Sequence, residues 1–324
     1  MPTNSAAARL AVAAITNFEK RVVDGQSDPF VEVRWWRKNG LFVTKSHGTS
    51  LRWQAVTARQ TTRGFQRETT TNPAPTNRLI TASLSNAGYS AAGQLHQTDL
   101  WECAGEQQIV DLMKHEMEWT PEALWRAITL DWYEDGTITT RSTNPITGMQ
   151  GAIINSGTYA GVSYTNESTF FGSGNNILTG NEHATFTTDP VASLTSAVLA
   201  AEQGTDAGDS TTFPNGIFMT YANWATVHNA LQAQGRGELD ASKYTTGAKD
   251  LMFMGVPIFR SRFQSANRYY VLNSKFMDFR LPTPQVLNTF KREEYSPWSI
   301  ILLMVFYGLF RVVLPRAQVR VTVS

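Results

Sequence analysis

The residues at 115–118 form the first group whose types could do metal chemistry. Two histidines four residues apart on a helix, with a glutamate after the first, bind zinc in many metalloproteases. Glu116 follows His115 and Glu118 lies close by, but Trp119 stands where the second histidine would be. The other histidines are dispersed, at positions 47, 96, 183 and 228. We therefore interpret the group as a solvated helix face and predict no metal site.

A nucleophile and a calcium loop are the next candidates. Cys103 is the one cysteine, so a disulfide framework is excluded, and a nucleophilic thiolate there would need a histidine beside it in the fold. Asp206, Asp209 and Asn215 lie in or beside a polar loop, but their spacing is not that of an EF-hand. Asp and Asn are common turn residues, which explains all three. We predict an inert thiol and no calcium site.

Phosphate-binding and serine-hydrolase motifs are absent from the sequence. It contains no GxxxxGK[ST] loop and no GxSxG turn. Two Gly-x-Gly runs, at 172–174 and 235–237, lack the third glycine of a dinucleotide-binding loop. We therefore predict no catalytic residue, no cofactor and no enzymatic activity.

Length and composition indicate a globular protein. The chain has 324 residues, which corresponds to about two domains of ~150 residues each. Hydrophobic residues make up 42%, enough for a packed core. The longest apolar run, 300–310, is far shorter than the ~18 residues that a membrane span needs, and the N-terminus lacks a signal-peptide pattern. We predict a soluble protein with no membrane partner.

Charge is distributed unevenly although the net charge is only +1. Residues 1–68 hold 11 Lys and Arg against 5 Asp and Glu, and residues 259–324 hold 10 against 3. Residues 69–258 hold 7 against 19, and ten of these carboxylates fall between Asp99 and Asp135. The pattern either reflects solvated faces or indicates that the basic ends meet the acidic middle, within one chain or between copies.

Alternating runs predict a long β-hairpin. Apolar and polar residues alternate over 51–55 and again over 80–84. The intervening segment 61–78 is polar and holds two prolines, which is typical of a tip outside the core. Such a hairpin buries little of itself, so we expect it to lie on another surface.

Helical spacing of apolar residues predicts helix over roughly 103–134. Thr120 and Pro121 resemble the start of a helix, so we expect either two helices or one long helix kinked at Pro121. Upstream, the alternation over 31–36 predicts a strand.

The rest of the chain reads as a mixture of strands and helices, so the fold class is α+β. We expect strands and loops over 137–187 and β-structure in the tail. The expected helices are 189–204, opened by Asp189 and closed by Gly204, and 224–235. The expected strands are 217–221, 251–259, 268–273, 299–314 and 319–323.

Several short motifs, in their order and spacing, resemble one known family. They lie at 133–136 (YEDG), 144–148 (NPITG), 159–162 (YAGV), 213–218 (FPNGIF), 254–259 (MGVPIF), 268–273 (RYYVLN) and 315–317 (PRA). Together these motifs resemble those of the major capsid proteins of tailed phages, which have the Hong Kong 97 fold. The resemblance covers residues 100–324, with the predicted hairpin at the place of the family's extended loop.

The resemblance implies a division into five parts. Residues 1–30 would be an N-terminal arm, and 31–98 would hold the extended hairpin loop. Residues 99–140, with the long spine helix, and 276–324, with the sheet, would form the peripheral domain. Residues 141–275 would form the axial domain.

The resemblance also implies a function, partners and a location. The chain would self-assemble into hexamers and pentamers of an icosahedral shell around double-stranded DNA, contacted without sequence specificity. The implied partners are the portal protein, a scaffolding protein and a decoration protein. Some relatives begin with a scaffold segment of ~100 residues, but no comparable helical extension precedes the first strand signal here. We therefore expect a separate scaffolding protein or a processed N-terminus. Location would be the virion, after assembly in the host cytoplasm. Alternatives are an encapsulin-like nanocompartment shell and a soluble β-rich hydrolase or binding protein.

Charge between the hairpin and the acidic helical stretch suggests contacts between subunits. We expect the arginines in or near the hairpin to face the carboxylates of a neighbouring copy. The candidate residues are Arg52, Arg59, Arg63, Arg67, Glu102, Glu106, Asp111, Glu116 and Glu118.

Overall fold

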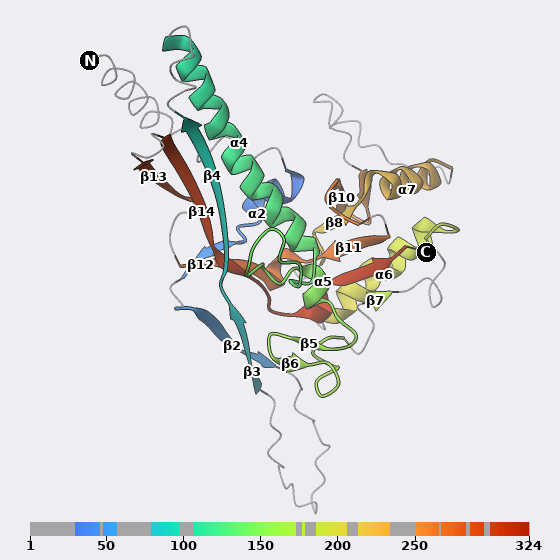
Figure 1. Cartoon of the computed structure of the whole chain (residues 1–324). Helices are drawn as coiled ribbons and strands as arrows, with labels where there is room; N and C mark the ends of the chain where they lie inside the picture. Colours follow the sequence, from blue (N-terminus) through green and yellow to red (C-terminus); the bar gives the residue numbers. More distant parts are fainter. Residues whose placement is uncertain are drawn as a thin grey trace, which may run out of the picture. The chain divides into compact units, whose positions relative to one another are not determined.

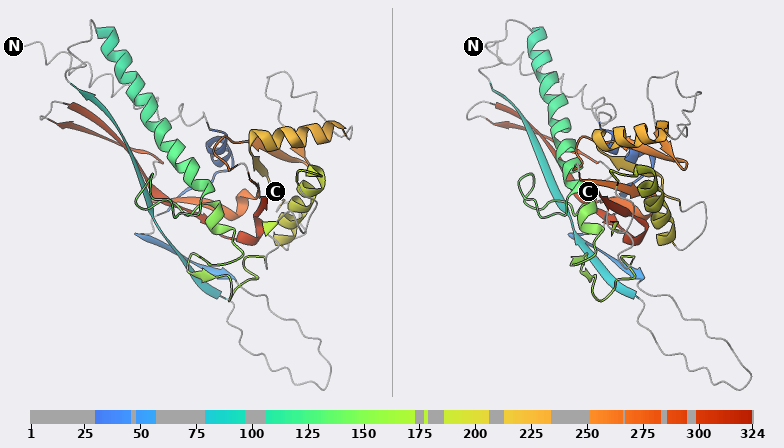
Figure 2. Two further views of the ribbon diagram at one scale, coloured as in Figure 1. Left: turned by 45° about the vertical axis from the view of Figure 1, so that its right-hand side comes forward. Right: turned by 90° about the vertical axis from the view of Figure 1, so that its right-hand side faces the viewer.

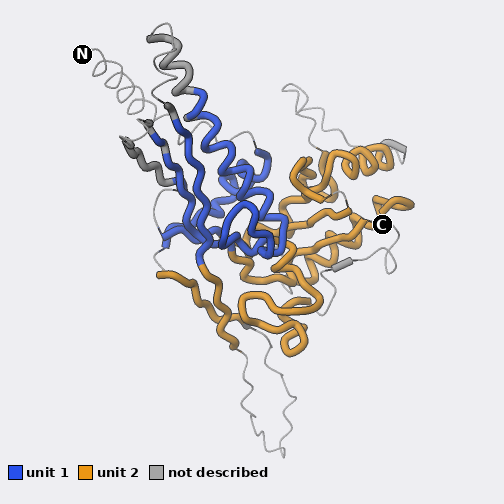
Figure 3. Tube along the Cα trace, in the orientation of Figure 1, with its two compact units in different colours: residues 1–46, 86–148, 279–310 blue, residues 47–85, 149–278, 311–324 orange. Residues whose placement is uncertain are grey.

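Figure 1 shows the computed structural model, in which the chain divides into two units. The structure describes residues 30–45, 48–56, 79–96, 106–172, 177–178, 186–205, 213–233, 251–265, 267–282, 286–294 and 299–323. Figure 3 colours the two units. Unit 1 comprises residues 1–46, 86–148 and 279–310, and unit 2 comprises 47–85, 149–278 and 311–324. The predicted arm and the hairpin tip lie outside the described residues.

Strand β14 (Ser299–Val312) is the central strand of the sheet in unit 1. It pairs antiparallel with β4 (Ala87–His96) and with β13 (Asn288–Glu294), which lie on opposite sides of it. Strand β12 (Met277–Leu281) also lies beside β14, and β1 (Phe42–Thr44) extends the sheet parallel to β12. The apolar run near 300–314 is therefore the strand that the sequence predicts.

Helix α4 (Glu106–Tyr133) is one continuous helix that lies along β4 (Figure 2). Of the two alternatives that the sequence left open, the single helix is correct, and Pro121 lies inside it. Thr120 is not a cap, because its hydroxyl donates to the Glu116 carbonyl 2.7 Å away, one turn earlier. Gly93 of β4 lets the helix approach: a Cβ there would lie 2.7 Å from the Thr120 hydroxyl.

Aromatic side chains fill the core of unit 1. Trp125 and Trp132 of α4 are fully buried, as their helical spacing predicts. The Trp36 ring lies 5.1 Å from Trp132 and 4.8 Å from Phe279 of β12, centre to centre. Phe279 in turn lies 4.9 Å from Phe310 of β14. Such tilted and edge contacts add ~0.5–1.5 kcal/mol per pair to the burial of the rings.

The strand predicted over 31–36 is wrong, because these residues form helix α2 (Val31–Lys38). Both tryptophans at 35 and 36 are buried, as is Val33, which one face of a strand cannot achieve but a helix can. Glu32, which a strand would turn to solvent, is also buried, and it accepts a 2.9 Å hydrogen bond from the Tyr133 hydroxyl. Six alternating residues are too few to distinguish the two periods.

The predicted hairpin is confirmed in unit 2. Strands β2 (Ser50–Val56) and β3 (Leu79–Ser85) are antiparallel, with Arg52 opposite Ser83. Ala55 and Ala82 are buried, and most other side chains of the two strands are at least partly exposed. The hairpin therefore supplies little core of its own.

A six-stranded sheet with two helices on one face forms the main body of unit 2 (Figure 2). Helices α6 (Pro190–Thr205) and α7 (Tyr221–Ala233) share an apolar core with the sheet. The strands lie in the order β7 (Ile177–Leu178), β15 (Val319–Thr322), β11 (Arg268–Leu272), β8 (Gly216–Met219), β10 (Val256–Arg260) and β9 (Leu251–Phe253). Asp189 caps α6 as predicted, since its carboxylate accepts from the Ala192 N–H at 3.0 Å.

Short strands and turns fill 137–172, as the composition predicts, but a short helix, α5 (Met149–Ala152), was not expected. The paired strands are β5 (Thr158–Tyr159) and β6 (Val162–Ser163). Two 3-10 turns, η3 (Ser274–Phe276) and η4 (Pro315–Ala317), precede β12 and β15.

Met254 occupies a left-handed position in the tight turn between β9 and β10, with φ +50° before Gly255 at φ +80°. Turns of this kind favour Asn or Gly first, because Gly has no Cβ to crowd the backbone and the short polar side chain of Asn can hydrogen-bond to it locally. We expect Met254→Asn to raise the free energy of unfolding by ~0.5–1 kcal/mol in urea titrations. The exposed neighbour Met252, on ordinary strand backbone, should give no gain when changed to Asn. A loss at Met254→Asn would contradict the strain.

Candidate interaction surfaces

The base of the hairpin is fixed to the rest of unit 2. The Ser83 N–H donates to the Ala160 carbonyl at 2.8 Å, which ties β3 to the turn between β5 and β6. The Arg311 guanidinium lies over the Trp53 ring, 5.5 Å from its centre, which ties β2 to the end of β14. The hairpin therefore leaves unit 2 in a defined direction.

An ion pair and a buried tyrosine hold this base. Arg311 donates to both oxygens of Asp278, from Nε at 2.9 Å and from Nη2 at 2.5 Å, and both side chains are mostly buried. The Tyr159 hydroxyl accepts a 2.9 Å bond from the Val312 N–H. Burial raises the pKa of Tyr159 above its usual range, so the phenol stays neutral. The exposed residues of β2 and β3, Arg52 and Leu79 among them, thus stand on a rigid support.

A shallow hollow lies on the outward side of α4, in unit 1. Its volume is about 450 Å³. Trp119, one of its lining residues, is 62% exposed, which is unusual for the largest apolar side chain. The lining residues are Trp119, Glu122, Ala123, Arg126, Ala127, Leu130 and Arg141. A lining that combines apolar and charged side chains is compatible with a protein-contact surface.

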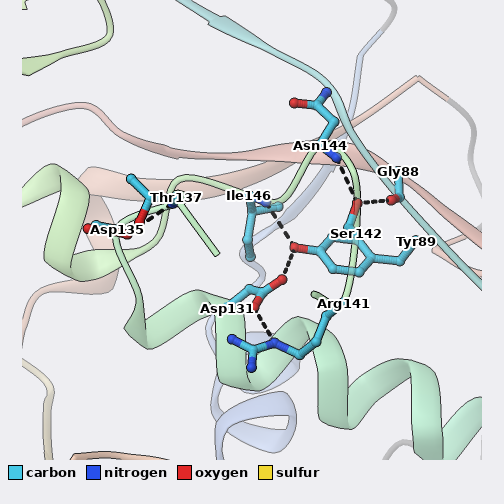
Figure 4. Close-up of polar contacts among 9 residues, drawn as sticks. All are labelled: Gly88, Tyr89, Asp131, Asp135, Thr137, Arg141, Ser142, Asn144 and Ile146. Atoms are coloured by element: carbon cyan, nitrogen blue, oxygen red, sulfur yellow. Dashed lines mark hydrogen bonds and ion pairs between the residues drawn. The ribbon is translucent and has the colours of Figure 1, made fainter. Parts of the chain in front are cut away.

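A buried polar network positions Arg141 at this hollow (Figure 4). Arg141 Nε donates to Asp131 at 2.5 Å, and the Tyr89 hydroxyl donates to the other carboxylate oxygen at 2.7 Å. Tyr89 in turn accepts from the Ile146 N–H at 2.9 Å. Burial, chiefly, raises the pKa of Tyr89 well above its usual range, so it acts as a neutral donor.

The loop that follows α4 is held by the same network. The Ser142 hydroxyl donates to the Gly88 carbonyl of β4 at 2.6 Å and accepts from the Asn144 N–H at 3.1 Å (Figure 4). Gly148 lies against the last carbonyls of α4, because a Cβ there would lie only 2.3 Å from the backbone carbonyl oxygen of Asp131. The hollow therefore has a preformed shape that does not depend on a free loop.

Few of the predicted contact residues can be placed. Arg59, Arg63, Arg67 and Glu102 lie outside the described residues; Glu106 and Asp111 belong to α4, but their side chains are not described. Arg52 is exposed on β2, Glu118 is partly exposed, and Glu116 lies over Gly93 of β4. Among the described residues, none of these three forms an ion pair, so the contact between hairpin and helix stays a prediction.

Trp119, Arg126 and Arg141 are surface residues that sequence analysis did not select. Trp119 departs from the buried stripe of Leu124, Trp125 and Ile128, and that departure was the available signal. Arg141 gave none, because its partner Asp131 lies ten residues away across the end of a helix.

Metal and membrane chemistry find no support in the described part of the chain. No three His, Cys, Asp or Glu side chains gather there as a possible metal group. No helix in that part is long and apolar enough to cross a bilayer. His115 packs against Trp119, and Asn215 bonds to the backbone and side chain of Ser274. Cys103, Asp206 and Asp209 lie outside the described residues.

Comparison with solved structures shows the fold of phage capsid proteins. The cyanophage A-1(L) capsid asymmetric unit aligns with a TM-score of 0.69 at 14% identity, over 89% of this chain and 92% of that one. The capsid of Myoviridae phage XM1 aligns at 0.56 and 14% identity, over 89% and 91%. The SrpI encapsulin of Synechococcus elongatus aligns at 0.52 and 10% identity, over 89% and 86%. No family model and no curated protein matches the sequence. The fold expected from the sequence motifs is thus confirmed.

Proposed function

We propose that this chain is the major capsid protein of a tailed bacteriophage. Copies would assemble as hexamers and pentamers of an icosahedral shell that encloses double-stranded DNA. The observation that carries the proposal is the alignment with a phage capsid subunit along 89% of the chain, which leaves little of it for another activity. The long hairpin supports it, because such a hairpin buries little of itself and needs another surface to lie on. The hollow on α4, with its exposed Trp119, supports it as a surface that a neighbouring copy could cover.

The parts of the fold then take the following roles. Residues 1–30 are the arm, and 31–98 hold the extended loop, of which β2 and β3 are the base. Residues 99–140 and 276–324 form the peripheral domain around α4 and β14, and 141–275 form the axial domain, whose sheet β15 completes from the end of the chain. Head-to-tail contacts between identical copies around an axis close into rings.

Hairpin arginines and helix carboxylates supply charge complementarity in this proposal. Arg52, Arg59, Arg63 and Arg67 would face acidic residues of α4 and of the segment before it in a neighbouring copy. Each exposed pair contributes only ~0–1 kcal/mol, but repetition over the shell would fix the register.

Further partners follow from the proposed role. They are a scaffolding protein during assembly, the portal protein, a decoration protein, and packaged DNA bound through its phosphates, with the virion as the final location and the host cytoplasm as the place of assembly. Phosphate contacts predict a strong salt dependence and no sequence preference.

Sedimentation of the purified protein tests the proposal. We expect ring-shaped capsomers or megadalton particles, visible by electron microscopy. A sedimentation profile with only monomers at every salt and protein concentration would overturn it.

An encapsulin-like shell is the second candidate, favoured by the likeness to the SrpI encapsulin. It differs in content rather than in fold. Nucleic acid inside particles isolated from their natural source supports the phage capsid, whereas an enclosed enzyme supports the nanocompartment.

Trp119 is the residue of the hollow that we expect to matter most for assembly. A buried tryptophan at an interface often contributes at least ~2 kcal/mol. Because Trp119 is exposed in the single subunit, Trp119→Ser should change the unfolding free energy of the subunit by less than ~0.5 kcal/mol. It should raise the critical concentration for assembly at least ~10-fold, measured by light scattering.

Leu199→Ser provides the matched control, since Leu199 is an exposed apolar residue of a helix in unit 2. We expect it to leave the critical concentration nearly unchanged. Equal effects of the two substitutions would exclude a special role for the hollow.

A further inference from the structure

Two arginines share the face of the six-stranded sheet in unit 2 that is turned away from α6 and α7. Strands β11 and β15 are antiparallel, with Tyr270 opposite Arg320 and Arg268 opposite Thr322. Side chains alternate along a strand, so these four lie on one face. Tyr269, on the other face, belongs to the core under α6. Diagonal neighbours on a sheet are ~7–8 Å apart, so the two guanidinium groups can reach one common ligand.

A neutral residue holds both arginines. Arg268 Nη1 donates to the side-chain oxygen of Gln150, and Arg320 Nη1 lies 3.5 Å from the Gln150 carbonyl oxygen. Neither arginine forms an ion pair with the described residues. Arg320 Nε is shielded from solvent and has no hydrogen-bond partner among the residues that the structure describes. Two like charges are thus held together without an anion.

Arg311 shows how a buried arginine is paired elsewhere in the protein. Its guanidinium is also largely buried, but Asp278 accepts from two of its nitrogens. A partly buried cation without a counter-ion is unfavourable, since burial removes water that nothing replaces. Burial, and to a smaller extent Arg268, lowers the pKa of Arg320, which agrees with this. Guanidinium groups match the two oxygens of a carboxylate or phosphate.

We propose that Arg268 and Arg320, braced by Gln150, form an oxyanion-binding site whose occupant in the assembled protein is a carboxylate from the acidic stretch 99–135 of a second copy. The occupant rests on the proposed self-assembly, whereas the site does not.

Charge and depth favour a carboxylate of a second copy. The segment 259–324, which contains both arginines, holds 10 basic residues against 3 acidic ones, whereas ten carboxylates lie between Asp99 and Asp135. Exposed Glu122 on α4 belongs to that stretch. Arg320 Nε is shielded from solvent, and a side-chain carboxylate is a smaller ligand for such a recessed site than the backbone of a DNA duplex. Duplex phosphates instead engage cations that project from the surface.

Unassembled protein tests the site with sodium glutarate as the probe, at constant ionic strength. At ten times its dissociation constant, glutarate should raise the melting temperature of the wild type by ~2–4 °C. Arg268→Gln/Arg320→Gln should lose this rise. Without glutarate the double variant should melt no lower than the wild type, because it loses the repulsion between the two guanidinium groups. Arg34→Gln/Lys275→Gln removes two exposed charges and should keep the rise. No rise in the wild type, or an equal rise in all three proteins, would overturn the site.

Assembled particles test the occupant. Wild-type shells should show no glutarate response, since the site is filled, and shells of the double variant should dissociate at lower urea concentration. A full glutarate response in wild-type shells would overturn the occupant. So would retention of a double-stranded oligonucleotide that the double variant loses and the control keeps. If no shells form, the second-copy occupant fails with the proposed function, while the titration of unassembled protein still decides the site.

Discussion

Asp131→Ala is expected to lower the free energy of unfolding by ~3–5 kcal/mol. Asp131 is 1% exposed, and both of its oxygens are used, one by Arg141 and one by the Tyr89 hydroxyl. Removal leaves a partly buried guanidinium without its counter-ion and a buried phenol without its acceptor. The loop that carries Arg141 and Ile146 should loosen with it. Urea titration followed by tryptophan fluorescence measures the loss, because Trp132 lies next to the site in the chain.

Glu122→Gln provides the control for Asp131→Ala, because Glu122 is an exposed carboxylate on the same helix. We expect a change within ~0.5 kcal/mol there. Tyr89→Phe should cost less than Asp131→Ala, since it removes the two hydrogen bonds of a neutral hydroxyl but leaves the Asp131–Arg141 ion pair in place. A loss under ~1 kcal/mol at Asp131→Ala would mean that the network contributes little to stability.

Periodicity predicted the elements whose burial is one-sided. The stripe of α4 and the alternation of β2 and β3 are both confirmed, because each has one face toward its own unit. The pattern predicts a strand where helix α2 forms, because it treats Glu32, which is buried, as a polar surface position. Its burial depends on the Tyr133 hydroxyl, 101 residues further along the chain, and no local pattern carries that information.

Contact surfaces were predicted less well than the fold. Local charge pointed to residues such as Glu116, which the structure places over Gly93 of β4. What distinguishes Trp119, Arg268 and Arg320 is what surrounds them: an exposed ring in a hollow, and two cations without an anion. Those properties arise from chain segments that are distant in sequence, so only the assembled fold reveals them.

Gly204→Ala is the second substitution with a large expected effect. The sequence pattern predicts that the helix ends at Gly204, but α6 continues to Thr205. Gly204 instead permits contact with η4, because a Cβ there would lie 1.8 Å from the Arg316 carbonyl oxygen and 3.1 Å from the Ala317 nitrogen. Both are backbone atoms, so the turn itself would have to move. We expect the free energy of unfolding to fall by ~2–3 kcal/mol or more, measured by urea titration.

The sign of the change at Gly204 discriminates between two physical causes. Helix propensity alone favours alanine over glycine by ~1 kcal/mol, so a helix end without the contact would be stabilised. The close approach to η4 predicts the opposite sign. Gln203→Ala, at the exposed neighbouring position, should change stability by less than ~0.5 kcal/mol and thus controls for substitution by alanine at this helix end. Since η4 leads directly into β15, displacement of the turn should also disturb Arg320. We therefore expect the Gly204→Ala protein to gain less melting temperature from glutarate than the wild type does. Higher stability in Gly204→Ala would show that the turn does not pack against α6 at this point.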